Sequence, residues 1–166
     1  MALEVAPPSV GTEENLLIKW IPTIADTSAP TVAEWDAGTA ITYSLTPSGW
    51  TPSGDQATVV DDRLTLAQAF ERPGKKTKSL SVQYVYGSDE DVAADTLVEG
   101  TEGYIGVRAG VANGDAAAAA QKVTIWPVRC GEQIEDPPVA NGVFTMTQKL
   151  FVIGEVKVRV PLAAGA

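Results

Sequence analysis

The segment from Phe144 to Val160 is the feature that most restricts how this chain can fold. It is β-type sequence throughout, and Gly154 is its single interruption. A typical strand has about 5–6 residues, whereas this segment would run about 56 Å if fully extended at roughly 3.3 Å per residue. A small domain does not readily pair so much strand internally, and unpaired strand edges promote aggregation unless they are covered or used.

Length and composition fit one globular domain spanning residues 1–166. Hydrophobic residues make up 45% of the chain and charged residues 20%, which is ordinary for a folded protein. No apolar run approaches the roughly 20 residues that cross a bilayer, and the N-terminal sequence lacks the basic and apolar regions of a secretory signal. We therefore expect a protein that is made in a cytoplasm and does not insert into a membrane.

Two absences argue against catalysis and metal binding. The chain has no histidine, the commonest general base and metal ligand, and its one cysteine, Cys130, cannot form an intrachain disulfide. Because Cys130 lies in the strand-like sequence WPVRC, we expect a buried thiol. Asp61 and Asp62 are adjacent on an expected strand and so point to opposite faces, where they are badly placed to share a site. The sequence predicts a protein that is not an enzyme and uses no cofactor.

The formal net charge of −9 comes from 21 acidic and 12 basic residues. Proteins that bind nucleic acid through its phosphates rely on Lys and Arg, so this balance argues against that class. Solubility alone also accounts for an acidic surface.

Alternation of apolar and polar residues predicts mostly β-structure. Residues 46–55, which are dense in Pro, Ser and Gly, predict a loop, and Trp50 within it is the tryptophan most free to reach a ligand. Trp20 and Trp126 lie in strand patterns, where a core position is the default. The other expected strands are residues 15–24, 39–46, 104–111 and 122–130.

Two short helices interrupt this pattern. Capping boxes predict that they begin at Thr31 and Ser88, and Gly38 and Gly100 predict their ends. The expected fold class is α+β, mainly β: two packed antiparallel sheets, as a sandwich or partial barrel, with one or two short flanking helices and a long β-hairpin.

The clearest local unit is the long hairpin, over residues 56–87. The sequence from Arg72 to Lys75 is typical of a type II turn, because glycine accepts the positive φ required at the third position. The return strand alternates apolar and polar residues, which predicts one buried and one polar face. The apolar set is Leu80, Val82, Tyr84 and Tyr86, and the polar set is Ser79, Ser81 and Gln83.

Both the hairpin and the C-terminal segment offer more strand edge than one small domain readily pairs. If these edges pair with further copies of the same chain in a closed ring, their backbone N–H and C=O groups are all hydrogen-bonded, as they are in a barrel. This favours a structural protein that assembles with itself. Two other classes stay open: a carbohydrate-binding or adhesion β-domain that uses Trp50, and a capsid decoration protein that binds another protein's lattice.

A resemblance to a known family lies in four segments: FERPGKKTKSLSVQYVYG, GTEGYIGVRAGV, KVTIWPVRCGEQ and FTMTQKLFVIGEVKVRVPLAA. Their order and spacing over residues 56–163 resemble the major tail protein of long, non-contractile-tailed bacteriophages, closest to those infecting actinobacteria. Residues 1–55 agree only in general character, and none of the four segments is a catalytic motif.

The resemblance implies a tail-tube fold whose hexameric rings stack into a hollow tube around a tape-measure protein, with tail-tip and terminator proteins as further partners. One sheet from each subunit would join a continuous inner β-barrel, and the C-terminal segment would change sheets at a bend or bulge at Gly154. The tube would lie in the virion tail after assembly in the bacterial host cytoplasm. Genomic double-stranded DNA would meet it only in transit, and an acidic or neutral lumen would let the DNA slide.

The resemblance also suggests which residues meet the lumen and the next ring. The lumen-lining candidates are Asp61, Arg63, Thr65, Ser79, Ser81, Gln83, Thr145 and Thr147. A merely solvent-facing role for these residues stays open. A basic hairpin tip would contact acidic residues of the adjacent ring through Glu71, Arg72, Pro73, Gly74, Lys75, Lys76 and Lys78. The domain would include an N-terminal arm, residues 1–14, and a C-terminal strand and tail, residues 144–166. Its two ends, residues 1–9 and 161–166, would be flexible arms that order on neighbouring subunits.

Overall fold

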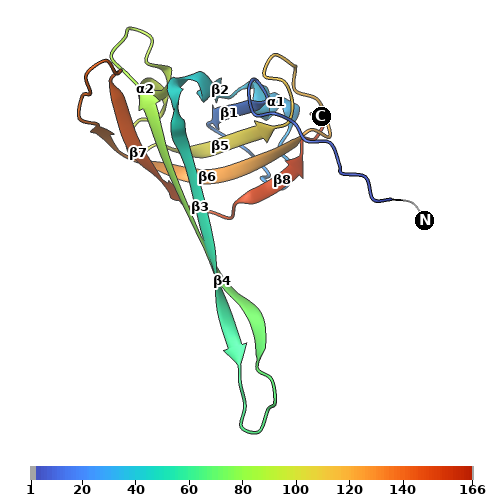
Figure 1. Ribbon diagram of the computed structural model, residues 1–166. Helices are drawn as coiled ribbons and strands as arrows, with labels where there is room; N and C mark the ends of the chain where they lie inside the picture. Colours follow the sequence, from blue (N-terminus) through green and yellow to red (C-terminus); the bar gives the residue numbers. More distant parts are fainter. Residues whose placement is uncertain (1–2, 166) are drawn as a thin grey trace.

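The computed structural model describes residues 3–165, whose strands form one curled antiparallel sheet (Figure 1). The strands are β1 Leu16–Ile21, β2 Thr39–Ala40, β3 Leu45–Asp61, β4 Phe70–Val85, β5 Glu102–Ala109, β6 Lys122–Glu135, β7 Thr145–Val152 and β8 Lys157–Pro161. The helices are α1 Val32–Asp36, the 3-10 helix η1 Thr42–Ser44 and α2 Val92–Thr96. The strand order is β2-β1-β5-β6-β7-β4-β3, and β8 pairs with β6. The predicted mainly β, antiparallel fold with two short helices and a long hairpin is confirmed, in its partial-barrel form.

The sheet has two hydrophobic cores, one on each face. The inner core lies in the hollow of the curl, where α2 and the base of the hairpin cover Trp20, Trp126 and Tyr84. The outer core lies under α1, where Trp35 packs against Ile21 and its neighbours on β1, β5 and β6. Strands β1, β5 and β6 are therefore covered on both faces. Strands β4 and β7 are covered on the inner face only, which leaves a polar outer face.

Two glycines of β5 make room for two core tryptophans, Trp20 and Trp35. A Cβ on Gly103 would lie 2.5 Å from the Trp20 ring, and a Cβ on Gly106 would lie 2.5 Å from the Trp35 ring. We expect Gly106→Ala to overpack the outer core and to lower the free energy of unfolding by about 1–3 kcal/mol, measured by thermal unfolding. Gly114→Ala is the control, because its Cβ would meet nothing within 4 Å. Equal melting temperatures for the two variants would contradict the prediction.

The C-terminal segment is two strands on the same edge of β6. β7 pairs with β6 as far as Val128↔Val152, and β8 resumes the pairing at Ile125↔Lys157. The connection between them, residues 153–156, is therefore a bulge. A Cβ on Gly154 would lie 3.1 Å from the Pro127 ring, so a glycine suits this close approach. The predicted bend at Gly154 is confirmed, but the predicted change of sheets is wrong, because β8 stays on β6. The prediction that the C-terminal tail orders on a neighbour is also wrong for residues 162–163, since Leu162 is buried and Ala163 N donates to Pro30 O at 2.8 Å in the same domain.

The hairpin begins earlier than predicted and turns elsewhere. β3 begins at Leu45 and pairs with β4 as far as Asp61↔Phe70, so the turn is residues 62–69. The predicted type II turn at Arg72–Lys75 is wrong, since these residues lie within β4. The predicted loop at 46–55 is also wrong, because it belongs to β3, an edge strand that tolerates proline.

Two further local predictions need correction. Residues 39–46 do not form one alternating strand: η1 follows β2, and Tyr43 is 79% exposed whereas Ile41 is fully buried. The capping box of Thr31 at α1 is confirmed. The one predicted at Ser88 is wrong, because α2 begins at Val92 and the N-cap residue Asp91 makes no side-chain capping bond.

Candidate assembly surfaces

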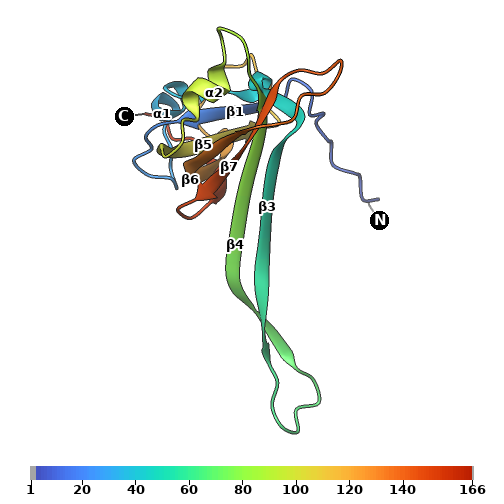
Figure 2. The same cartoon turned by 90° about the vertical axis from the view of Figure 1, so that its left-hand side faces the viewer.

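The β3–β4 hairpin leaves the domain as a two-stranded ribbon (Figures 1 and 2). Residues 51–60 of β3 are exposed, as are residues 70–78 of β4 apart from the half-buried Gly74. An isolated two-stranded ribbon is marginally stable at best in water. In the described chain β3 also leaves one long edge unpaired. The ribbon therefore offers a partner two faces and two strand edges, that of β3 and that of β4 before Leu80.

The end of the ribbon is apolar, whereas the sequence predicted a basic tip. Leu64 is 96% exposed and Phe70 is 60% exposed. We call the exposed set Val59, Val60, Leu64, Leu66 and Phe70 the apolar tip. Exposed apolar clusters of this kind mark contact surfaces.

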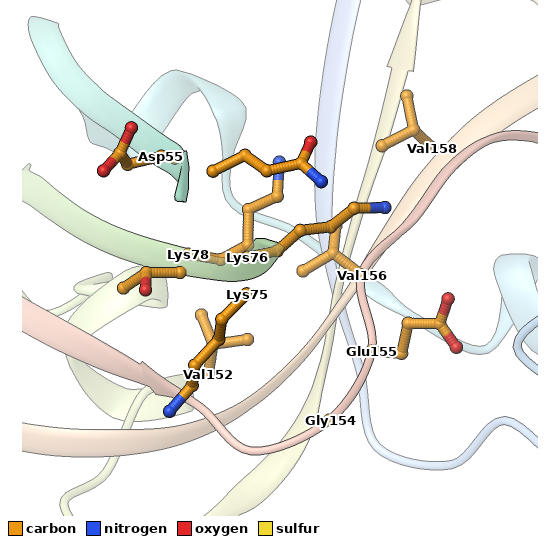
Figure 3. Close-up of a pocket in the computed structure, with 12 residues that line it drawn as sticks. Asp55, Lys75, Lys76, Lys78, Val152, Gly154, Glu155, Val156 and Val158 are labelled. Atoms are coloured by element: carbon orange, nitrogen blue, oxygen red, sulfur yellow. The ribbon is translucent and has the colours of Figure 1, made fainter. Parts of the chain in front are cut away.

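A groove of about 750 Å³ separates the ribbon from the β7–β8 connection (Figure 3). The groove opens at Leu80↔Leu150, where β4 stops pairing with β7. From there the ribbon leaves the sheet, whereas β7 and then β8 continue along β6. One wall is the β4 segment that carries Lys75, Lys76 and Lys78. The other wall carries Val152, Glu155, Val156 and Val158. We call this the lysine groove.

The lysine groove is lined by three lysines and two acids, Asp55 on β3 and Glu155 in the β7–β8 connection, so its lining has a positive formal charge on an acidic chain (Figure 3). The side chain of Lys78 crosses Gly54, whose Cβ would lie 3.0 Å from the lysine Cδ and Nζ. On the opposite wall Glu155 pairs with Lys157 at 2.8 Å. The Lys157 ammonium lowers the pKa of Glu155, and the charge of Lys76 adds to this effect. The groove thus joins a cationic wall to a largely apolar one.

The predicted inter-ring residues lie in the ribbon, not at its tip. Lys75, Lys76 and Lys78 line the lysine groove. The remaining four, Glu71, Arg72, Pro73 and Gly74, lie between the groove and the apolar tip on β4.

The predicted lumen-lining residues divide into two groups. Asp61, Arg63 and Thr65 lie at the far end of the hairpin, where Arg63 Nε donates to Asp61 at 3.0 Å and the acid offsets the arginine charge. The structure brings the other five together on the outer faces of β4 and β7. These are Ser79, Ser81, Gln83, Thr145 and Thr147.

Asp136 organises this second group, although it is not among the residues predicted from the sequence. Its carboxylate accepts hydrogen bonds from Gln83 Nε2 at 2.9 Å, Thr147 Oγ1 at 2.8 Å and Thr145 Oγ1 at 2.9 Å. The bond from Gln83, followed by those from the two threonines, lowers the pKa of Asp136. Asp136 directly follows β6 in the sequence EDPP, and nothing in that pattern separates it from an ordinary loop acid.

Replacing Asp136 by Asn should lower the melting temperature most clearly at neutral pH. The carboxylate has a pKa below its ordinary value of 3.8, so its stabilising effect is fully present above that value and is lost as the pH falls through the folded-state pKa. The difference in melting temperature from the unmodified chain should therefore be larger at pH 7 than at pH 3, which lies below the ordinary aspartate pKa of 3.8. Asp62→Asn serves as the control, and a difference independent of pH would contradict the prediction.

Residues considered for catalysis or glycan binding occupy structural positions. Cys130 is buried, as predicted, and burial raises the pKa of its thiol to about 11, which leaves little reactive thiolate at neutral pH. Trp50 packs edge-to-face on Trp126 with ring centroids 6.4 Å apart, so the prediction of a free loop tryptophan is wrong. Trp20 and Trp126 are core residues, as predicted.

Two other kinds of site are absent over residues 3–165. Within this part of the chain, the structure gathers no three His, Cys, Asp or Glu residues into a group that could hold a metal ion. Over the same residues, no helix has the length and apolarity needed to span a membrane.

Comparisons with known proteins agree with this fold. Among solved structures, a chain of the "Cryo-EM structure of the anti-feeding prophage (AFP) baseplate, 6-fold symmetrised" has a TM-score of 0.57 and 10% sequence identity, over 92% of this chain and 96% of that chain. At this identity the likeness concerns the fold alone. No curated protein matches the chain significantly. The family model described as "Phage tail tube protein" matches residues 5–165, and the chain therefore belongs to the phage tail tube protein family, whose members are structural components of the virion tail.

Proposed function

We propose that six copies of this chain form a ring and that stacked rings build the hollow tail tube through which the phage genome is delivered. The observation that carries the proposal is the β3–β4 ribbon, which is exposed on both faces and has two free strand edges in the described chain. A natural protein does not leave such a ribbon in water without a use for it. Contact with neighbouring subunits would cover its faces and its edges.

The curled sheet supports a ring. Its strand order ends in β3 on one side and in the two-residue β2 on the other, so the sheet can continue from one subunit to the next. A sheet that continues around a closed ring has no free edges. The ring number of six comes from the resemblance, and it agrees with the six-fold symmetry of the similar baseplate structure.

The outer face of β4 and β7 is the surface we assign to the lumen. Ser81, Gln83 and Thr147 are uncharged there, and the nearby charges of Asp136 and Lys149 have opposite signs. A conduit for DNA should not hold phosphates through clustered Lys and Arg. This face meets that requirement, whereas the lysine groove does not.

The proposal takes residues 1–166 as a single tail-tube domain without enzymatic activity. We place it in a long, non-contractile tail of the kind found on phages of actinobacteria, on the resemblance of the four sequence segments. The tube would surround a tape-measure protein and join tail-tip and terminator proteins after assembly in the host cytoplasm. Genomic DNA would pass through without lasting contact.

Negative-stain electron microscopy of the concentrated, purified chain tests the proposal. We expect stacked rings or hollow tubes. Particles of single-subunit size at every concentration, also after addition of preformed tail-tip complexes as nuclei, would contradict it.

A further inference from the structure

The N-terminal segment is an extended arm that its own domain leaves uncovered. Residues 3–11 have no regular secondary structure, and every residue from 3 to 14 is exposed. The arm runs away from the domain in both views (Figures 1 and 2). Leu3 is 88% exposed and Val5 is 84% exposed. Pro7 and Pro8 favour an extended backbone, and nine extended residues reach about 30 Å.

The lysine groove has charges that the described chain does not pair. Over residues 3–165 the cations in ion pairs are Arg63, Arg129 and Lys157. The three lysines of the groove therefore form no ion pair there, and they outnumber the two acids of the lining, Asp55 and Glu155. Across the groove the valines of the β7–β8 connection remain partly open, and Val158 is 60% exposed.

The arm and the groove are complementary in charge and in polarity. Residues 3–14 contain Glu4, Glu13 and Glu14 and no Lys or Arg. In an extended segment successive side chains alternate between two faces, so Leu3 and Val5 lie on one face and Glu4 on the other. That alternation matches a groove with an apolar wall and a cationic wall.

We propose that the N-terminal arm of one copy docks in the lysine groove of a second copy of this chain. The inference rests on the proposed self-assembly and adds to it a defined contact. Leu3 and Val5 lie against the valine wall, and Glu4 faces the lysines of β4. The occupant is another copy because the arm leads away from its own domain.

Disulfide trapping between two full-length variants tests this contact. One variant carries Val5→Cys, and the other carries Val158→Cys with a tag that changes its mass. A disulfide requires Cα atoms within about 7 Å, so oxidation of the concentrated mixture should link the two variants. Native Cys130 is only 2% exposed and does not compete.

The matched control replaces Val158→Cys by Val98→Cys, which is 51% exposed and does not line the groove. We expect the mixed disulfide to form at least about five-fold more with Val158→Cys than with Val98→Cys, because docking raises the effective concentration of the arm at the groove alone. Equal yields would overturn the docking proposal.

Electron microscopy of the same samples separates this inference from the proposed function. Tubes with equal disulfide yields would leave the tube proposal standing and overturn arm docking. The selective disulfide without rings or tubes, also after addition of preformed tail-tip complexes, would support arm docking and contradict the tube. A further variant carries both Val5→Cys and Val158→Cys in one chain. If it forms an internal disulfide at high dilution, the arm reaches its own groove, and the proposal of a second copy as the occupant is overturned.

Discussion

Replacing Lys75, Lys76 and Lys78 together by Glu is expected to stop tube growth while the subunit stays folded. The three side chains are exposed in the isolated chain, so their reversal removes no core contact. It lowers the formal net charge from −9 to about −15 and places acids against an acidic arm. A pair of opposite charges at an exposed site is worth about 0.2–1 kcal/mol. One such pair for each of six subunits, between Glu4 and a groove lysine, would contribute about 1–6 kcal/mol to the proposed hexamer.

The measurement compares tube counts in electron micrographs at matched protein concentration. Thermal unfolding checks that the subunit remains folded. A variant with Lys122, Lys149 and Arg159 changed to Glu has the same net charge and should still assemble, because these exposed residues do not line the groove. Adding Glu4→Lys and Glu13→Lys to the groove variant should restore part of the assembly if the arm is the partner. Normal tubes from the groove variant would refute the expectation.

The elements that sequence reasoning predicted correctly are those fixed by local contacts. Alternation along β4 predicted its buried face, and Leu80, Val82 and Tyr84 are each no more than 1% exposed. The cap of α1 was predicted because its partners, Thr31 and Glu34, are three residues apart. Such features depend on neighbours in the sequence and so are readable from it.

The hairpin turn was misplaced because a long-range pairing overrides a local preference. Pro73 lies opposite Thr58 in the ladder, next to a register shift between Gln56 and Thr58. The Pro-Gly pair therefore accompanies an irregularity in the ribbon and not its turn. Prolines within sheets occur at strand edges and at bulges, and both conditions are met here, since only β3 pairs with β4 in this part and the register shift is adjacent.

The candidate surfaces could be predicted only in part. The basic cluster of the hairpin is visible in the sequence, but the groove depends on the divergence of β4 from β7 after Leu80↔Leu150, which no local pattern encodes. Asp136 was missed because its partners lie on two other strands, β4 and β7, which only the folded sheet brings to it. The lumen and ring contacts stay predictions for the same reason, since they need a second copy.

Substitutions in the apolar tip are expected to have the second large effect on tube assembly. In a variant with Leu64→Ser and Phe70→Ser, we expect long tubes to be absent and only subunits or rings to form. Both side chains lie at the end of the ribbon, where residues 62–70 are all exposed, so the substitutions should change the melting temperature of the subunit little. Burying two such side chains against the next ring is worth about 3–6 kcal/mol for each subunit. Summed over a hexamer this reaches about 18–36 kcal/mol for each ring contact before the entropy of ordering the turn is subtracted.

Sedimentation velocity distinguishes subunits, rings and tubes by mass and so measures this loss. Val98→Ser is the control, because it also removes an exposed apolar side chain, 51% accessible, but lies beside α2 and away from the ribbon. Tubes of normal length from the tip variant would mean that the tip stays in solvent within the stack. Tube growth would then depend on the lysine groove and the ribbon edges. Of the two variants, only the charge-reversal variant should then fail to form tubes. Loss of tubes in both variants, with rings surviving only in the tip variant, would assign the groove to contacts within a ring and the tip to contacts between rings.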